Sequence, residues 1–171
     1  MIDNLADRFT DKSQMSAMKA MFVAKRNRHS IIDLPHLLFA LLEFPEDILA
    51  QVIQLLEIDV KGLKKRIYKV IKLQEKVPFW TRRDWKMFVT PNVKKSIETA
   101  ISLSEKRGDE KASSMHLLYG VVDSTINYPR TEIQLELYLL LRDANISPSI
   151  LISALDEVDQ DKDEIDLVKK E

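Results

Sequence analysis

The feature that most constrains this chain is an internal repeat with an offset of 80 residues. The offset superimposes Phe9-Thr10 on Val89-Thr90, and it superimposes His36-Leu37-Leu38 on His116-Leu117-Leu118. A segment that recurs at a fixed offset forms one supersecondary unit, which buries its apolar face against the neighbouring copy. We therefore expect two similar units that share an interface about a pseudo-two-fold axis.

Apolar residues recur with helical spacing in nearly every segment of both units. Four helices are expected in the first unit, over residues 10–28, 33–44, 46–56 and 59–73. Asp33 can cap the second of these, with Pro35 in its first turn. In the second unit, helices are expected over residues 90–107 and 113–123, after Pro129, and from Ser147-Pro148. The pattern predicts an all-α fold, in which two tandem four-helix repeats pack as a pseudo-two-fold bundle.

These elements divide the chain into a double-repeat domain over residues 5–157 and an acidic tail over residues 158–171. Within the domain, the first repeat covers residues 5–73, a linker covers residues 74–89, and the second repeat covers residues 90–157. Residues 156–171 carry a net charge of −5, which is typical of a solvated and mobile segment. We expect a tail or linker outside the packed domain; it could also fold back onto the basic segment between the repeats or lead towards a further domain.

Composition excludes several classes of function. The three glycines cannot form the phosphate-binding loops G-x-x-x-x-G-K-[ST] or G-x-G-x-x-G. The absence of cysteine excludes disulfides, thiolate zinc sites and cysteine nucleophiles. The formal net charge of −1 favours neither a nucleic acid nor a membrane as partner. Because no apolar run can span a bilayer and no signal peptide is recognisable, we expect a cytoplasmic protein. Because the phosphate-binding loops and cysteine ligands are missing, we expect no cofactor.

A set of short motifs recurs in the same order in both repeats. The two copies are, in order, Phe9-Thr10, His36 to Leu42 and Ile58-Asp59, and then Thr90-Pro91, His116 to Val122 and Ile146-Ser147. In order, doubling and spacing the set resembles the Clp N-terminal repeat domain of AAA+ unfoldases, across residues 5–157. The resemblance implies a non-catalytic, monomeric domain that docks substrates or adaptor proteins for an ATP-dependent unfoldase or protease. Such a chain is either a free-standing homologue or part of a longer unfoldase.

The sequence departs from this family at two kinds of position. The family usually has a glutamate directly before the motif histidine, and in some members this acid and the motif threonine bind phosphorylated arginine. Here Pro35 and Met115 take the place of those acids, although Thr10 and Thr90 remain. Since a carboxylate would hold the guanidinium side of that ligand, we expect no such activity. The family's turn glycine is also replaced, by Glu57 and Asn145, which should change only how the turn closes.

The motif histidines invite a catalytic or metal-binding interpretation. His36 and His116 occupy equivalent positions near the starts of helices, but neither has a second histidine three or four residues away. We expect both to be buried or half-buried parts of the repeat core. His29 falls in a loop and is assigned no special role. No spacing of serines or carboxylates with a histidine indicates an enzyme.

The first long helix is apolar on two sides. One stripe contains Met15, Met18 and Phe22, whereas another is made of alanines and Met21. A helix that is apolar on two sides either packs between two layers or presents one face to a partner. We favour packing in the core for the methionine stripe. Methionine is also a flexible side chain that suits recognition surfaces, so the partner interpretation stays open.

The linker alternates aromatic with basic residues, and residues 61–95 carry a net charge of +10. Three interpretations are open. The aromatic side chains anchor the linker across the groove between the repeats, which we favour; or they form a protein-binding hot spot; or they stack on single-stranded nucleic acid. The residues concerned are Phe79, Trp80, Arg82, Arg83 and Trp85.

Together these features predict a non-catalytic domain that binds a protein partner of a Clp-type system. Binding would use the apolar groove between the two repeats, and the linker would supply a second contact surface. The alternative is a small helical protein that associates with nucleic acid through its basic and aromatic residues.

Overall fold

The computed structural model describes residues 3–170 of the chain and confirms the all-α fold. Nearly every helix begins at the cap that the sequence predicts, but two helices end later than expected: α7 continues to Asn127 instead of ending near residue 123, and α9 continues to Val168, beyond the expected domain end at residue 157. The elements in chain order are α1 (Asp3–Ala6), α2 (Asp11–Arg26), β1 (Ile31–Ile32), α3 (Leu34–Glu43), α4 (Asp47–Leu55), α5 (Val60–Ile71), β2 (Phe88–Val89), α6 (Pro91–Arg107), α7 (Ser114–Asn127), α8 (Glu132–Asp143) and α9 (Pro148–Val168).

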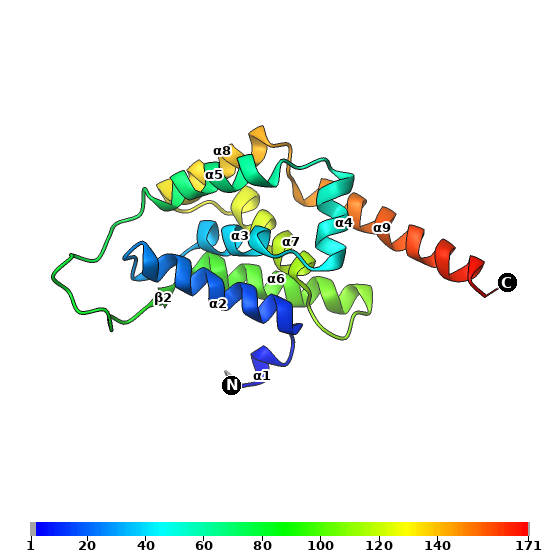
Figure 1. Ribbon diagram of the computed structural model, residues 1–171, viewed down its shortest axis with the longest axis horizontal. Coiled ribbons are helices and arrows are strands. Elements are labelled where there is room, and N and C mark those ends of the chain that lie inside the picture. Colours follow the sequence, from blue (N-terminus) through cyan, green and yellow to red (C-terminus); the bar gives the residue numbers. More distant parts are fainter. Residues whose placement is uncertain (1–2, 171) are drawn as a thin grey trace.

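The helices form three layers (Figure 1). Helices α2 and α6 form one outer layer, α3 and α7 form the middle layer, and α5 and α8 form the other outer layer, with α4 and α9 at one end. Contacts between the repeats come in pairs that the pseudo-two-fold axis relates: α2 packs on α7 as α6 packs on α3, and α4 packs on α9 as α8 packs on α5. The two repeats therefore share one continuous core.

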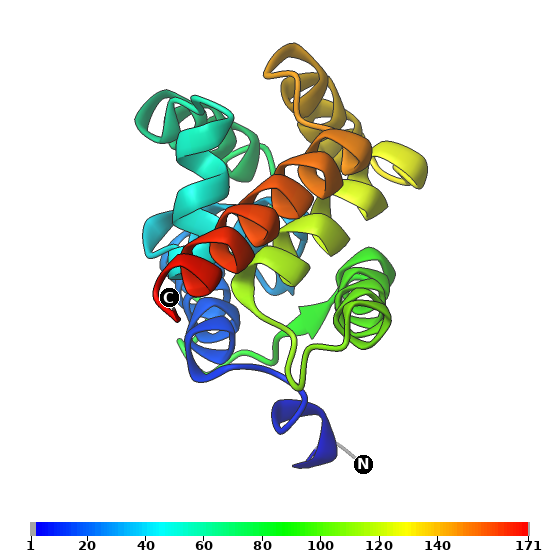
Figure 2. The same cartoon turned by 90° about the vertical axis from the view of Figure 1, so that its right-hand side faces the viewer.

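Two short parallel backbone pairings join the repeats, and the helical periodicity gave no sign of either. Ile32 pairs with Val89 in the ladder between β1 and β2, and Phe9 forms an isolated bridge with Ala112. The 80-residue offset relates Ile32 to Ala112 and Phe9 to Val89, so the two pairings are equivalent, with the two repeats exchanged. In Figure 2, β2 lies between α2 and α6. Each pairing is followed directly by the motif threonine that caps the next long helix: Thr10 caps α2, and Thr90 caps α6.

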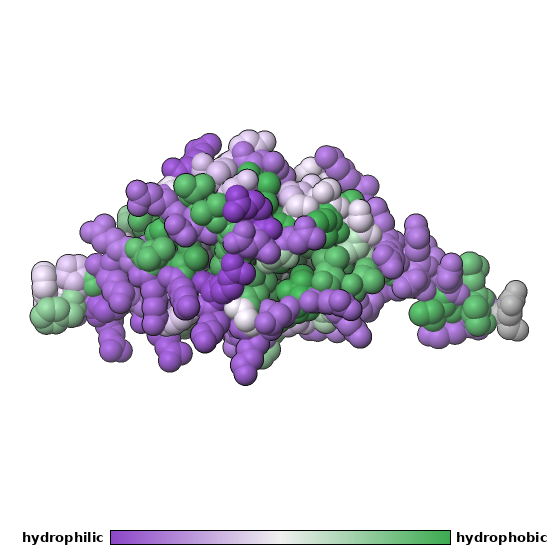
Figure 3. All heavy atoms as spheres, turned by 90° about the horizontal axis from the view of Figure 1, so that it is seen from above, coloured by the Kyte–Doolittle hydropathy of each residue, from purple (hydrophilic) through white to green (hydrophobic). Residues whose placement is uncertain are grey.

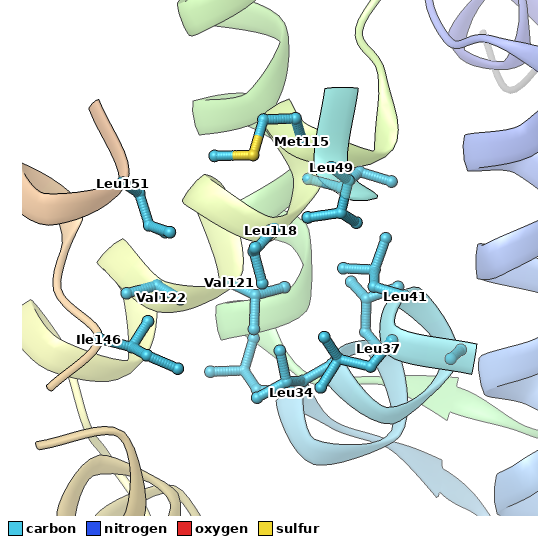
Figure 4. Packing of buried hydrophobic residues seen from close by; sticks show 14 of the residues in the cluster. Leu34, Leu37, Leu41, Leu49, Met115, Leu118, Val121, Val122, Ile146 and Leu151 are labelled. Carbon is cyan, nitrogen blue, oxygen red and sulfur yellow. The ribbon is translucent and has the colours of Figure 1, made fainter. Parts of the chain in front are cut away.

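The core is centred on α3 and α7, whose side chains meet in the middle layer (Figure 4). Eight of the ten residues of α3 are buried, so this helix has almost no solvent-facing side. Leu34, Leu37 and Leu41 of α3 face a cluster that includes Leu118 and Val121 of α7. A helix that is apolar all round is stable only when other elements cover it on every side. The remaining helices provide that cover.

Glycine at position 120 is required by the packing of α6 against α7. A Cβ atom at Gly120 would lie 2.1 Å from the backbone oxygen of Ser96 on α6, which is far inside van der Waals contact. The equivalent residue in the first repeat is Ala40, which is also buried. The second repeat therefore packs its first two helices more closely than a side chain at this position would allow.

We predict that Gly120→Ala lowers the free energy of unfolding by about 1–3 kcal/mol, because the added methyl group forces α6 and α7 apart. Urea unfolding followed by far-UV circular dichroism measures this change. Ser102→Ala, on an exposed position of α6, is the matched control and should leave stability nearly unchanged. Equal stability of Gly120→Ala and the unsubstituted chain would contradict the close approach.

The turns that lack the family's glycine keep a left-handed backbone conformation. Glu57 has φ 51° and Asn145 has φ 55°, directly after α4 and α8. Both turns close with the same kind of hydrogen bond, in which the backbone N–H after the left-handed residue donates to the carbonyl oxygen five residues earlier. Ile58 donates to Ile53, and Ile146 donates to Leu141. Both turns therefore adopt the left-handed closure without a glycine at the position that requires it.

Glu57→Gly should therefore stabilise the domain by about 0.5–1 kcal/mol, because glycine enters the left-handed region without a Cβ penalty. Thermal unfolding monitored by circular dichroism would show a raised Tm. As a control, Glu98→Gly in the middle of α6 removes the same side chain where φ is helical, and it should lower the Tm. A lower Tm for Glu57→Gly would show that the side chain matters more than the backbone.

Residues 158–168, expected to be a mobile tail, continue α9 as a helix. The start of this extension is fastened to α6, because the Arg107 guanidinium bonds to Asp156 at 2.8 Å and to Asp159 at 2.5 Å. Beyond Val158 the helix projects from the body, mostly hydrophilic but with apolar atoms at its tip (Figure 3). Those atoms belong to the exposed side chains of Ile165, Leu167 and Val168.

Candidate protein-docking surface

Each motif threonine donates its hydroxyl to a carboxylate of the chain itself. The Thr10 hydroxyl lies 2.7 Å from Glu46 Oε1, and the other oxygen of Glu46 accepts the backbone N–H of Ser114 at the start of α7. The Thr90 hydroxyl lies 2.9 Å from Asp33 Oδ1, which also accepts from the Gln134 amide at 2.9 Å. Both hydroxyls are therefore committed to internal bonds: that of Thr90 joins the two repeats directly, whereas that of Thr10 stays within the first repeat and holds the carboxylate that bonds to Ser114 of the second. Sequence reasoning recognised Asp33 as a cap but missed Glu46, which lies far from both motifs along the chain.

The motif histidines cap the helices in which they lie. His36 Nδ1 accepts the backbone N–H of Asp33 at 3.0 Å, and His116 Nδ1 accepts that of Ser113 at 2.9 Å. Since Nδ1 accepts a hydrogen bond, each neutral ring carries its proton on Nε2. His116 directs Nε2 at Asp109 Oδ2, 3.1 Å away. Both side chains are buried, as expected, and their chemistry is that of a helix cap.

His29 falls in the loop after α2, as expected, but it has a role that the sequence did not indicate. It is fully buried, and its Nδ1 lies 2.9 Å from His36 Nε2. Its backbone oxygen accepts the indole N–H of Trp85 at 3.2 Å. The residue thus links the capped start of α3 to the linker. The seven-residue separation of the two histidines gave no signal of this contact, because it depends on how the turn after α2 folds back.

The methionine stripe of α2 does not fill the core. Met15, Met18 and Phe22 are each more than half exposed, whereas the buried face of the helix carries Ser13, Ser16, Ala20 and Ala24. Small side chains on that face let α3 approach closely, and the serine hydroxyls bond to carbonyl oxygens one turn back. The packing interpretation of this stripe was therefore wrong. Its residues are at the surface, where the partner interpretation requires them.

An apolar groove of about 350 Å³ lies between α2 and α6. Met18 and Ala17 line it from α2, Val93 and Ile97 line it from α6, and residues of both backbone pairings and of α1 complete it. The groove thus lies at the boundary of the two repeats and draws on both. Apart from Ser13 and Gln14, the side chains that line it are apolar.

The stripe residues face three separate hollows. Met15 lines one together with Phe44, where Lys19 Nζ lies 3.3 Å from the Phe44 ring centre. Met18 lines the groove between α2 and α6. Phe22 lines a third, about 470 Å³ in volume, together with Arg83 and Trp85 of the linker. The structure therefore brings Phe22 to the linker, whereas the sequence placed the two in separate segments.

The linker forms an extended loop that stands out from one end of the molecule (Figure 1). Phe79 and Trp80 are 82% and 74% exposed, and they contact each other edge to face. Only Trp85, among the aromatic residues proposed to anchor the loop, is partly buried and hydrogen-bonded to the core. Anchoring across the groove is therefore wrong for Phe79 and Trp80. Arg82 and Arg83 are exposed on the same loop.

The basic residues of segment 61–95 do not form one continuous surface. Lys64 pairs with Glu43, and Arg66 approaches Asp143 at 3.7 Å, so part of the charge on α5 is neutralised by acids of neighbouring helices. Lys95 of α6 lies over the ring of Tyr128. Within residues 3–170, no cluster of three potential metal ligands occurs. None of the helices in this part of the chain has the length and apolar character that crossing a bilayer requires.

Comparison with known proteins identifies the class to which this fold belongs. The sequence matches the Clp repeat (R) N-terminal domain family over residues 8–130, and the chain therefore belongs to this family. It is 28% identical over 112 residues to the chaperone protein ClpB of Bacillus anthracis, a match that covers 66% of this chain. It is likewise 29% identical over 112 residues to ClpB of Bacillus cereus. The chain corresponds to only 13% of the length of these relatives.

Solved structures agree with this assignment of the fold. The N-terminal domain of Hsp104 from Candida albicans superimposes with a TM-score of 0.65 at 15% identity, covering 88% of this chain and 90% of that one. The N-domain of ClpV from Vibrio cholerae also gives a TM-score of 0.65 at 15% identity, covering 91% and 90%. Both are N-terminal domains, and their fold agrees with the family shown by sequence.

Burial lowers the pKa of His36 to about 4, with a further lowering by the neighbouring His29 ring. In the unfolded chain His36 is therefore protonated as the pH falls below about 6.5, whereas in the folded chain it is protonated only near pH 4. Stability is lost as the pH falls through this window, by up to about 3 kcal/mol. Urea unfolding measured at steps between these pH values tests this expectation.

The control for this measurement is His36→Gln, since glutamine at the same helix position can also accept the backbone N–H but does not titrate. Its loss of stability between pH 6.5 and pH 4 should be smaller than that of the unsubstituted chain by about the same amount. Burial also lowers the pKa of His29 and of His116, so some acid sensitivity will remain in the variant. Identical pH profiles would show that His36 is not the group concerned.

Proposed function

We propose that this chain is a protein-docking domain, which binds substrate or adaptor proteins for a Clp-type ATPase. The family consists of non-catalytic N-terminal domains of such ATPases, and the chain has the complete double-repeat fold of that class. The observation that carries the proposal is the apolar groove between α2 and α6, because an open apolar hollow at the junction of two repeats marks an interaction site.

The occupant we propose is an apolar segment of a partner polypeptide. Met18 lies at one wall of the groove and is 55% exposed, so it can rearrange around different apolar side chains. Val89, at the end of the backbone pairing, is also exposed in the groove. Burial of these surfaces would supply most of the affinity. Met15 and its hollow beside Phe44 would extend the same surface along α2.

The internal bonds of Thr10 and Thr90 support a route other than phosphoarginine recognition. Their hydroxyls already donate to Glu46 and Asp33, and Pro35 and Met115 offer no carboxylate for a guanidinium. A ligand of that kind would have to break these internal bonds, one of which joins the repeats. Binding of an apolar segment in the groove between α2 and α6 requires no such rearrangement, because neither threonine lines it.

The groove is tested with a labelled, permanently unfolded polypeptide such as fluorescein-labelled casein, whose binding is followed by fluorescence anisotropy. Met18→Glu should weaken binding about tenfold or more, because it places a charge in the apolar wall. The matched control is Met21→Glu, which adds the same charge to α2 at an exposed residue that does not line the groove.

Backbone amide NMR shifts of the labelled domain locate the contact directly. The shifts should concentrate on the residues that line the groove when casein is added. Equal loss of binding in the two glutamate variants, or shifts confined to other faces, would contradict the groove as the docking site.

A further inference from the structure

The third hollow, between the end of α2 and the linker, has a composition unlike the groove. It is about 470 Å³ in volume, and four of its six lining residues are cationic while the other two are aromatic. This volume lies within the range of pockets that hold small ligands or single side chains. We call it the basic-aromatic pocket. Its lining residues are Phe22, Lys25, Arg26, Arg28, Arg83 and Trp85.

The wall of the pocket that the linker provides is held to the core. Arg28 donates from Nε to the Val77 oxygen at 3.1 Å, its guanidinium also bonds to the Pro78 oxygen, and it lies over the Trp85 ring. Val77 returns a backbone bond to Arg28, and Trp85 donates its indole N–H to His29. One pocket wall is thus pre-organised, which reduces the entropy that a ligand must overcome.

The remaining cations of the pocket have no acidic partner. None of the ion pairs within residues 3–170 uses Lys25, Arg26 or Arg83. The acid nearest along the loop, Asp84, approaches Arg82 instead, at 3.9 Å. Three exposed positive charges therefore surround two aromatic rings, and none of the three is paired with an acid within the described chain. Such a set is complementary to an acidic group attached to an aromatic or large apolar one.

From this geometry we infer that the basic-aromatic pocket binds an acidic peptide segment of the partner protein, in which an aromatic or large apolar residue is flanked by aspartate or glutamate. The inference rests on the proposed docking function, and it names the chemistry of a second contact next to the apolar groove. Phe22 and Trp85 receive the apolar residue, while Lys25, Arg26 and Arg83 receive the carboxylates. Electrostatic attraction by the pocket also speeds the encounter with an acidic partner.

The structure favours a peptide over single-stranded nucleic acid. Bases stack on open ring faces, but one face of Trp85 is occupied by Arg28, and Phe79 and Trp80 are turned edge to face at 5.0 Å. A nucleic acid also needs a continuous row of cations for its phosphates, whereas basic residues of α5 pair with acids of other helices.

The test uses a short synthetic peptide in which phenylalanine is flanked by aspartate and glutamate. Two matched peptides replace either the acids by asparagine and glutamine or the phenylalanine by alanine. The domain carries Trp80→Phe, so that Trp85 remains as the single tryptophan and its fluorescence reports on the pocket. The acidic aromatic peptide should change this fluorescence, and each matched peptide should bind about tenfold more weakly or worse.

Arg83→Glu should abolish the fluorescence change, because it reverses the charge of a residue that lines the pocket. Its control is the neighbour Arg82→Glu, which is equally exposed and changes net charge identically but does not line the pocket. This control should retain most of the binding. Equal weakening in both variants would reduce the effect to general charge attraction and overturn the inference.

Three other outcomes would also overturn it. Binding of the uncharged peptide as tightly as the acidic one would remove the role of the cations. Arg83-dependent binding of a single-stranded oligonucleotide in preference to the peptide would make this a nucleic-acid site. Assembly of the domain alone, dependent on its concentration and abolished by Arg83→Glu, would make a second copy the occupant.

The two proposals fail separately. Met18→Glu should leave binding of the acidic peptide unchanged, since the pocket and the groove share no lining residue. Loss of casein binding with retained peptide binding therefore assigns the defect to the groove alone, and the reverse pattern assigns it to the pocket.

Discussion

Most residues of helices α3 and α7 are buried, so both helices must be enclosed by other elements, and the rest of the structure follows from covering them. They pack against each other at the pseudo-two-fold axis, and each is then enclosed by helices of both repeats. The shared core leaves neither repeat able to bury its motif helix alone. Within the second repeat, α6 approaches α7 so closely at Gly120 that no side chain can be accommodated.

Burying both motif helices also buries their polar starts, which must find partners within the protein. The structure meets this demand with the histidine caps and with two carboxylates of the first repeat. Asp33 and Glu46 both accept bonds from residues of the second repeat, so the polar caps act as fasteners between the repeats. Thr10 and Thr90 thereby take a structural part in this chain.

Because the core uses the small-residue face of α2, the large apolar side chains of that helix are left at the surface. They line hollows of different chemistry: an apolar groove towards α6 and a basic-aromatic pocket towards the linker. One helix thus connects two sites that a single extended partner segment could contact together.

The helical periodicity and the caps were enough to predict the all-α fold, because these are local properties that each segment carries by itself. The repeat offset predicted the doubled helices, and the family was indicated by the resemblance of the doubled motifs. The aromatic and basic linker residues were identified in the same way. What the sequence could not determine was which face of α2 is buried: both of its stripes are apolar, and the choice depends on how closely α3 can approach. The same holds for His29, Glu46 and the meeting of Phe22 with Trp85, which join segments far apart in the chain. These contacts exist only once the two repeats have closed around α3 and α7, so only the tertiary structure decided them.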